Sequence, residues 1–175
     1  IDQLGLTIPH NGGVSTAPDS ALASSAVSRA GKIGNRFCIL PMEGWDGTEE
    51  GEPTDLTRRR WQRFGLSGAK LIWGGEAVAV RHDGRANPRQ LVLSEGNLAS
   101  IASLRQDLVE AHAGSFGNTD DLCIGLQLTH SGRYAVPARK GRAPRIAYRH
   151  PLLDQRVGVD SDAPVLSDDD LLQLT

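Results

Sequence analysis

The sequence predicts an α/β fold of parallel βαβ units, because short apolar runs alternate along the chain with segments of helical spacing. The three apolar runs lie at 37–41, 71–80 and 122–128, with one helical segment in each interval between them. Each run is nearly continuous in apolar residues, as in strands that are buried on both faces of a parallel sheet. The length of 175 residues, 39% of them hydrophobic, suits one domain of ordinary size.

The first strand, at 37–41, is a short apolar run that ends at a proline, and an acidic, glycine-containing loop follows it. Thr54 is expected to be the N-cap of the first helix, because threonine is among the residues preferred at that position. Trp61 lies on the apolar face of this helix, and Gly65 and Gly68 predict its end.

The second helix has the clearest pattern in the chain. Its apolar residues recur at spacings of three and four, at Leu98, Ile101, Leu104, Leu108 and Ala111. Gly114 predicts the end of this helix. The strands at 71–80 and 122–128 stand on either side of it and complete the alternating order.

The two ends of the chain lack this alternation. Residues 1–34 contain a long stretch of Gly, Ala and Ser and are predicted to form a loosely packed N-terminal arm ahead of the main domain at 35–175. Residues 129–164 are predicted to form a long loop, and Ser167 is expected to cap a last helix that the sequence leaves incomplete. Because three strands do not close a barrel, the sequence is expected to cover only part of a larger fold.

Composition excludes several classes of function. With 19 Lys and Arg against 21 Asp and Glu, the net charge of −2 argues against a dedicated nucleic-acid or membrane-surface protein. No apolar run approaches the roughly 20 residues that cross a bilayer. Cys38 and Cys123 cannot form a disulfide framework and are expected to be reduced core residues of a cytoplasmic protein. The five histidines show no zinc-binding spacing, so no metal site is expected.

Candidate ligand contacts follow from the strand ends, since ligands of parallel α/β folds bind beyond the carboxyl ends of the strands. The residues that close the three runs are Pro41, Met42 and Glu43 in the first, Glu76, Ala77 and the residues after them in the second, and Gln127, Thr129 and His130 in the third. A glutamine amide both donates and accepts hydrogen bonds, while a small alanine and a stiff proline let a flat ring approach the backbone. These strand ends therefore predict a binding edge for a planar polar ligand.

Three segments resemble motifs of the Old Yellow Enzyme family of flavin oxidoreductases. Residues 35–42, NRFCILPM, are similar to its first strand, which runs from Asn-Arg through an apolar stretch to Pro-Met. Residues 76–80, EAVAV, followed by Gly84 and Arg85, resemble the end of its second strand. Residues 126–133, LQLTHSGR, are similar to its third strand end, Gln-Leu followed by His-Ala-Gly-Arg. The three segments stand in the family's order.

The resemblance implies a TIM (β/α)8 barrel that binds FMN non-covalently, of which this chain would supply about the first three βα units. By resemblance, Pro41 and Met42 would lie against the flavin ring, Ala77 would pack near its pyrimidine edge, and Gln127 would hydrogen-bond that edge. The implied reaction is that of an ene-reductase, in which hydride passes from NAD(P)H through the flavin to an activated alkene.

Two features depart from the family pattern. Glu43 stands where the family usually has a Thr or Cys that donates a hydrogen bond to a flavin carbonyl, and an ionised carboxylate only accepts. We therefore expect Glu43 to be protonated, with a pKa raised by burial, or to be turned toward the acidic loop. Gly74 and Gly75 interrupt the second strand and predict a bulge or looser packing.

The catalytic residues of the family are expected beyond residue 175, so this fragment alone is expected to be inactive. His130 and Arg133 belong to the third motif and are expected to brace the long loop. Two other interpretations stay open: a truncated, inactive paralogue, and a binder of anionic ligands or nucleic acid through the basic loop 133–156. The choice between NADH and NADPH, the substrate and the oligomeric state are open as well.

Overall fold

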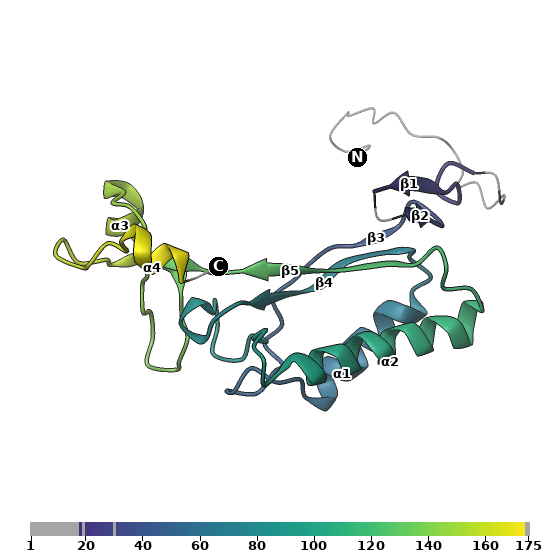
Figure 1. Ribbon diagram of the computed structural model, residues 1–175, viewed down its shortest axis with the longest axis horizontal. Helices are drawn as coiled ribbons and strands as arrows, with labels where there is room; N and C mark the ends of the chain where they lie inside the picture. Colours follow the sequence, from purple (N-terminus) through teal and green to yellow (C-terminus); the bar gives the residue numbers. More distant parts are fainter. Residues whose placement is uncertain (1–17, 19, 30, 174–175) are drawn as a thin grey trace, which may run out of the picture.

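Three parallel strands form the central sheet, in the order β3-β4-β5 (Figure 1). The computed structural model describes residues 18, 20–29 and 31–173. The strands are β3 (Cys38–Ile39), β4 (Leu71–Ala79) and β5 (Cys123–Thr129). The long helices between them are α1 (Asp55–Leu66) and α2 (Leu98–Phe116), so the predicted alternation of strands and helices is confirmed.

Both long helices cover the same face of the sheet (Figure 1). The core lies between the helices and the strands and consists of Trp61, Ala69, Ile72, Val78, Leu91, Ile101, Leu104 and Leu108. Leu104 and Leu108 are fully buried because their spacing of four places them on one side of α2. The helical periodicity therefore identified Ile101, Leu104 and Leu108 as core residues correctly, whereas Leu98, in the same pattern, is 58% exposed.

Helix α1 begins as the sequence predicts and ends differently. Thr54 is its N-cap, and the Thr54 amide donates to the Thr57 hydroxyl at 3.1 Å. The expectation that Gly65 ends the helix is wrong, because Gly65 lies inside α1 where a Cβ would collide with the carbonyl oxygen of Leu108 in α2. Glycine is used here for close packing, and the left-handed Gly68 (φ +76°) follows the helix end.

Helix α2 likewise passes its predicted end. It continues through Gly114 to Phe116 and stops at Gly117, which has a φ of 74°. Gly114 has open space around its Cβ position, so nothing in its surroundings requires the helix to stop there. The predicted bulge in β4 is confirmed, since the pairing with β5 shifts register between Trp73 and Ala77.

Short elements occur at both ends of the described chain. Residues 1–17, 19 and 30 of the predicted arm lie outside the described residues, while β1 (Ala26–Ser28) and β2 (Gly31–Ile33) form an antiparallel hairpin near the amino ends of the parallel strands (Figure 1). The predicted loop 129–164 contains two helical elements, η3 (Gly132–Tyr134) and α3 (Pro151–Val157). A further short turn, η2 (His82–Gly84), follows β4, and α4 (Asp168–Leu172) begins at the predicted cap, Ser167.

The cysteines are free, as expected, but the prediction that both are core residues is wrong, because neither belongs to the core cluster. Cys38 is exposed and Cys123 is half-buried. Cys38 belongs to β3, which pairs only with β4 among the described residues, so no neighbouring strand covers its other side. Within the described part of the chain, no helix is both long and apolar enough to span a membrane.

Candidate functional site

Strands β4 and β5 end side by side, and the segment that follows β3 runs along β4 to the same edge of the sheet (Figure 1). The amide of Ala77 donates to the carbonyl oxygen of Met42 at 3.1 Å, and Ala77 is the register partner of Gln127. The structure thus brings together the five residues that the sequence singled out, Pro41, Met42, Glu43, Ala77 and Gln127. We call these five residues the strand-end rim.

Strand alternation decides which side of the sheet each rim residue faces. In β5, Ile124 and Leu126 pack against the core, so Gln127 points to the opposite face. In β4, Val78 belongs to the core, and Ala77 therefore shares the opposite face with Gln127. This face is not covered by any helix among the described elements (Figure 1), and we call it the open face.

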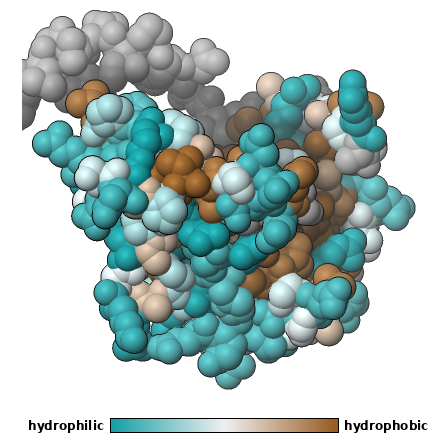
Figure 2. All heavy atoms as spheres, turned by 60° about the vertical axis from the view of Figure 1, so that its left-hand side comes forward, coloured by the Kyte–Doolittle hydropathy of each residue, from teal (hydrophilic) through white to brown (hydrophobic). Residues whose placement is uncertain are grey.

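The open face carries an aromatic floor that sequence reasoning missed. Trp73 is 51% exposed, and its ring lies 3.1 Å from the position that a Cβ of Gly125 would take. Trp73 and Gly125 are register partners, so the missing side chain at 125 makes room for the indole. The signal in the sequence was a large aromatic in one strand and a glycine in the next. In Figure 2, hydrophobic residues (brown) reach the surface between hydrophilic residues (teal).

Gln127 is the rim residue with the greatest freedom to bind. Its side chain is exposed, and it has no hydrogen bond to any described residue. The carboxamide therefore offers two donors and an acceptor above the aromatic floor. Its register partner Ala77 is buried, at 4% exposed, so the carboxamide of Gln127 is the group that the rim offers to the polar edge of a flat heterocycle.

Glu43 lies in a cavity of about 380 Å³ between the end of β3 and α1. Apolar residues Leu40, Met42 and Phe64 line much of this cavity, and Arg60 also reaches it. Burial raises the pKa of Glu43 above its ordinary value of 4.5, which is the direction of the first expectation. Trp45 and Asp46 of the acidic loop line the same cavity, which agrees with the second expectation.

Behind the rim, a buried ion pair joins β4 to α1. The Glu76 carboxylate is fully buried and accepts hydrogen bonds from the Gly44 amide at 2.8 Å and from Trp61 Nε1 at 3.4 Å. Arg60 donates to Glu76 and also to both carboxylate oxygens of Asp46, at 2.9 Å each. The sequence marked Glu76 as a strand-end residue but gave no sign of these partners.

Burial and pairing act in opposite directions in this network. Burial raises the pKa of Glu76, and the charge and hydrogen bonds of Arg60, with those of Gly44 and Trp61, offset part of that increase. At Asp46 burial also raises the pKa, but the hydrogen bonds and charge of Arg60, with hydrogen bonds from Thr57 and the backbone, together hold the pKa below its ordinary value.

A second buried polar residue, Gln90, holds the other side of Ala77. Its Nε2 donates to the Ala77 carbonyl at 2.8 Å and to the Thr129 hydroxyl at 3.1 Å. Its Oε1 accepts from the Ala86 amide at 2.7 Å. Gln90 therefore satisfies a carbonyl at the rim and ties the end of β4 to the end of β5.

Comparison with known proteins finds solved structures that share this architecture. No family model and no curated protein sequence matches the chain. Solved structures do match: the Old Yellow Enzyme homologue from Zymomonas mobilis has 19% identity and a TM-score of 0.63, and the match covers 89% of this chain and 42% of that one. The Old Yellow Enzyme from Pichia sp. AKU4542 has 13% identity and a TM-score of 0.63, with 89% and 40% covered. Morphinone reductase has 20% identity and a TM-score of 0.54, with 76% and 33% covered.

The chain has the fold of the Old Yellow Enzymes. The chain spans less than half the length of the solved enzymes that it matches. At these identities the likeness is one of fold, and it agrees with the resemblance that the three sequence motifs indicate.

Within this Old Yellow Enzyme fold, two of the motifs interlock. The Ser131 amide donates to the Gly84 carbonyl at 2.7 Å, and the Val136 amide donates to the Arg85 carbonyl at 2.8 Å. The buried Arg85 guanidinium donates to four backbone carbonyls, those of Glu49, His82, Pro88 and Pro137. Arg85 thus joins the loops that follow all three parallel strands.

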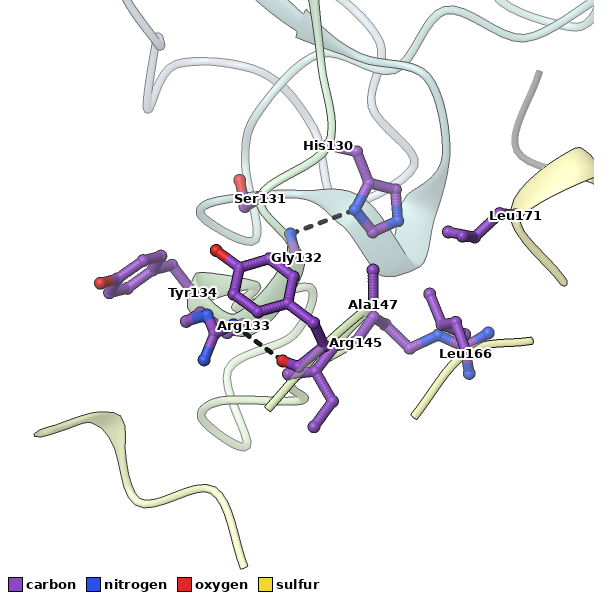
Figure 3. A pocket seen from close by; sticks show the side chains of 11 residues that line it. His130, Ser131, Gly132, Arg133, Tyr134, Arg145, Ala147, Leu166 and Leu171 are labelled. Carbon is purple, nitrogen blue, oxygen red and sulfur yellow. Dashed lines mark hydrogen bonds between the residues drawn. The ribbon is translucent and has the colours of Figure 1, made fainter. Parts of the chain in front are cut away.

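The third motif also supports a pocket beyond β5, with a volume of about 350 Å³ (Figure 3). His130 Nδ1 accepts from the Gly132 amide at 3.1 Å, and Arg133 pairs with Asp154 of α3 and donates to the Tyr148 carbonyl at 3.0 Å. Burial lowers the pKa of His130 below 6.5. These contacts agree with the expectation that His130 and Arg133 brace the long loop.

No group of three or more His, Cys, Asp or Glu side chains among the described residues could hold a metal ion.

Proposed function

We propose that this chain is the flavin-binding amino-terminal part of an FMN-dependent oxidoreductase of the ene-reductase type, and that it forms the first three βα units of a (β/α)8 barrel. The observation that carries the proposal is the position of Ala77, bonded to Met42 at 3.1 Å and paired in register with Gln127. These residues belong to the strand-end rim, and the fold that carries the rim is shared with Old Yellow Enzymes and morphinone reductase.

Each rim residue would make a different kind of contact with FMN. Gln127 would hydrogen-bond the polar edge of the isoalloxazine, and Ala77 would let that edge approach the backbone. Pro41 and Met42 would give apolar and backbone contact, and a protonated Glu43 would donate to a flavin carbonyl. When bound, FMN supplies hydride transfer from NAD(P)H to an activated alkene. The protein would hold the ring at the rim.

The first test is FMN binding by the full 175-residue chain, followed by quenching of flavin fluorescence. Gln127→Ala should weaken binding by about two- to ten-fold, the cost of roughly 0.5–1.5 kcal/mol for one net hydrogen bond. Gln106→Ala is the matched control, because Gln106 is an exposed glutamine on α2 that bonds only Glu110 among the described residues. Equal affinity in all three proteins, or no binding by wild type, would overturn the proposal.

The second test is turnover. With FMN bound, we expect the chain to show little or no NAD(P)H-dependent reduction of 2-cyclohexenone, because the catalytic residues are expected beyond residue 175. A chain that neither binds FMN nor folds cooperatively would favour the inactive paralogue. We further propose a cytoplasmic location, which cell fractionation would test.

We also propose that the basic loop does not bind nucleic acid. Several of its arginines are engaged within the protein: Arg133 with Asp154, Arg139 with Glu49 at 2.8 Å, and Arg149 with the Asp160 carbonyl at 2.8 Å. Binding to DNA or RNA that falls steeply with salt would contradict this proposal.

A further inference from the structure

We propose that Glu76 is a positioning residue for the strand-end rim and that it acts through the backbone amide of Gly44. This inference rests on the proposed flavin-binding function of the rim. It concerns the face of β4 opposite to the one that would meet the ligand.

Glu76 and Ala77 are consecutive residues of β4 and therefore face opposite sides of the sheet. Ala77 points toward the open face although it is only 4% exposed, whereas Glu76 is fully buried against α1. Both residues hold the same segment after β3. The Ala77 amide binds the Met42 carbonyl at 3.1 Å, and the Glu76 carboxylate binds the Gly44 amide at 2.8 Å.

These two bonds flank Glu43. Because Met42 and Gly44 are both attached to β4, the backbone of the residue between them is held at two points. The direction in which the Glu43 carboxyl leaves the backbone is therefore set in part by Glu76. Loss of the Glu76 bond would free the backbone at Gly44 without changing the chemical identity of any rim side chain.

The carboxylate of Glu76 is itself held firmly. Its second oxygen accepts from Arg60 at 2.5 Å and from Trp61 at 3.4 Å, and Arg60 also binds Asp46 with two hydrogen bonds of 2.9 Å. Asp46 lies two residues after Gly44, so the same arginine ties the segment to α1 a second time. Breaking a buried ion pair is strongly destabilising, because it leaves a charge without a partner. The contacts of Glu76 with Arg60 and Trp61 therefore hold its carboxylate in one position.

The backbone at Gly44 has no room to shift toward this network. A Cβ at position 44 would lie only 3.0 Å from Glu76 Oε1 and would collide with Arg60. The glycine therefore permits the close approach through which the amide reaches the carboxylate.

The test compares Glu76→Leu with Glu76→Gln in the full chain, with FMN as the probe. Leucine removes the acceptor for the Gly44 amide, whereas glutamine keeps an oxygen that can accept it. We expect Glu76→Leu to bind FMN about ten-fold more weakly, the effect of roughly 1.4 kcal/mol, and to change the visible circular dichroism of the bound flavin. Glu76→Gln should restore most of the affinity and the wild-type dichroism.

Asp107→Asn is the matched control. It also removes a carboxylate that pairs with an arginine of α1, at 2.8 Å from Arg58, but it lies on α2 and contacts no rim residue. We expect it to lower stability without changing the flavin spectrum. Glu76→Leu with wild-type affinity and dichroism would overturn the positioning role alone, whereas absence of FMN binding by wild type would overturn the proposed function together with it.

If Glu76→Leu does not fold, hydrogen exchange at Gly44 in the wild type decides the question. An amide that is protected without ligand, and more strongly protected with FMN, supports the positioning role. Protection of the Gly44 amide that FMN leaves unchanged overturns it.

Discussion

The two faces of the parallel sheet are built from the same strands but have different roles. On the helix-covered face, Ile72 and Val78 are almost completely buried against α1 and α2. On the open face, Trp73 is 51% exposed and Gln127 is also exposed. Alternation along a strand thus assigns one set of residues to stability and the neighbouring set to presentation of a binding surface.

The largest expected effect comes from comparing a leucine-to-alanine substitution at a buried position with one at an exposed position. Leu104→Ala removes a fully buried side chain from α2 and should lower the free energy of unfolding by about 2–5 kcal/mol. Leu40→Ala removes a side chain that is 71% exposed and should change it by less than about 0.5 kcal/mol. Urea unfolding followed by far-UV circular dichroism measures both. Similar losses would contradict this division between buried and exposed side chains.

A second pair of substitutions sharpens the comparison within the helical layer. Gly65→Ala places a methyl group against the Leu108 carbonyl and should destabilise by about 1–3 kcal/mol, because α1 and α2 must separate. Gly114→Ala, in open space on α2, should stabilise by roughly 0.5–1 kcal/mol through helix propensity. Thermal unfolding with opposite signs for the two variants is the expected result.

These glycines also show where sequence reasoning reached its limit. A glycine at the end of an apolar pattern predicts a helix end, yet Gly65 serves a contact with Leu108, 43 positions further along the chain by their numbers. The exposure of Cys38 escaped prediction for a related reason, since apolar composition does not tell which strand lies at an edge. The short helix α3 has seven residues within a basic segment, too few for a periodic pattern to stand out.

The rim itself was more predictable than its support. Parallel strands end at a common edge, so Met42, Ala77 and Gln127 could be placed together from three apolar runs. Glu76 and Gln90 could not be assigned their partners, because their hydrogen bonds join segments that only the folded chain brings together. Local pattern therefore located the binding edge, while the polar contacts that hold it depend on tertiary structure.

A third prediction concerns the charge at the rim and depends on FMN binding. As the pH rises through the raised pKa of Glu43, the wild type should lose a hydrogen-bond donor to the flavin and gain a negative charge beside it. Its flavin potential should therefore fall by about 30 mV more than that of Glu43→Gln, the equivalent of roughly 1.4 kcal/mol for a two-electron couple. Potentiometric titration from about pH 5 to 8 measures this difference.

The control for this prediction is Glu95→Gln, since Glu95 is an exposed carboxylate in the turn before α2. It should leave the potential and its pH dependence unchanged. Superimposable profiles for wild type and Glu43→Gln would exclude a direct role for Glu43.

The smallest expected effect lies beyond β5, where a single group changes its charge. Burial lowers the pKa of His130 below its ordinary value of 6.5, and the nearby Arg81 and Arg145 oppose its protonation while Asp83 favours it. The unfolded chain then binds the proton more readily, so stability is complete above pH 6.5 and declines as the pH falls below that value. Protonation would also remove the Nδ1 acceptor of the Gly132 amide. His130→Asn, whose side-chain oxygen can take that role without titrating, should flatten this part of the stability profile. A decline of equal slope in both proteins would assign it to carboxylates elsewhere and not to the histidine.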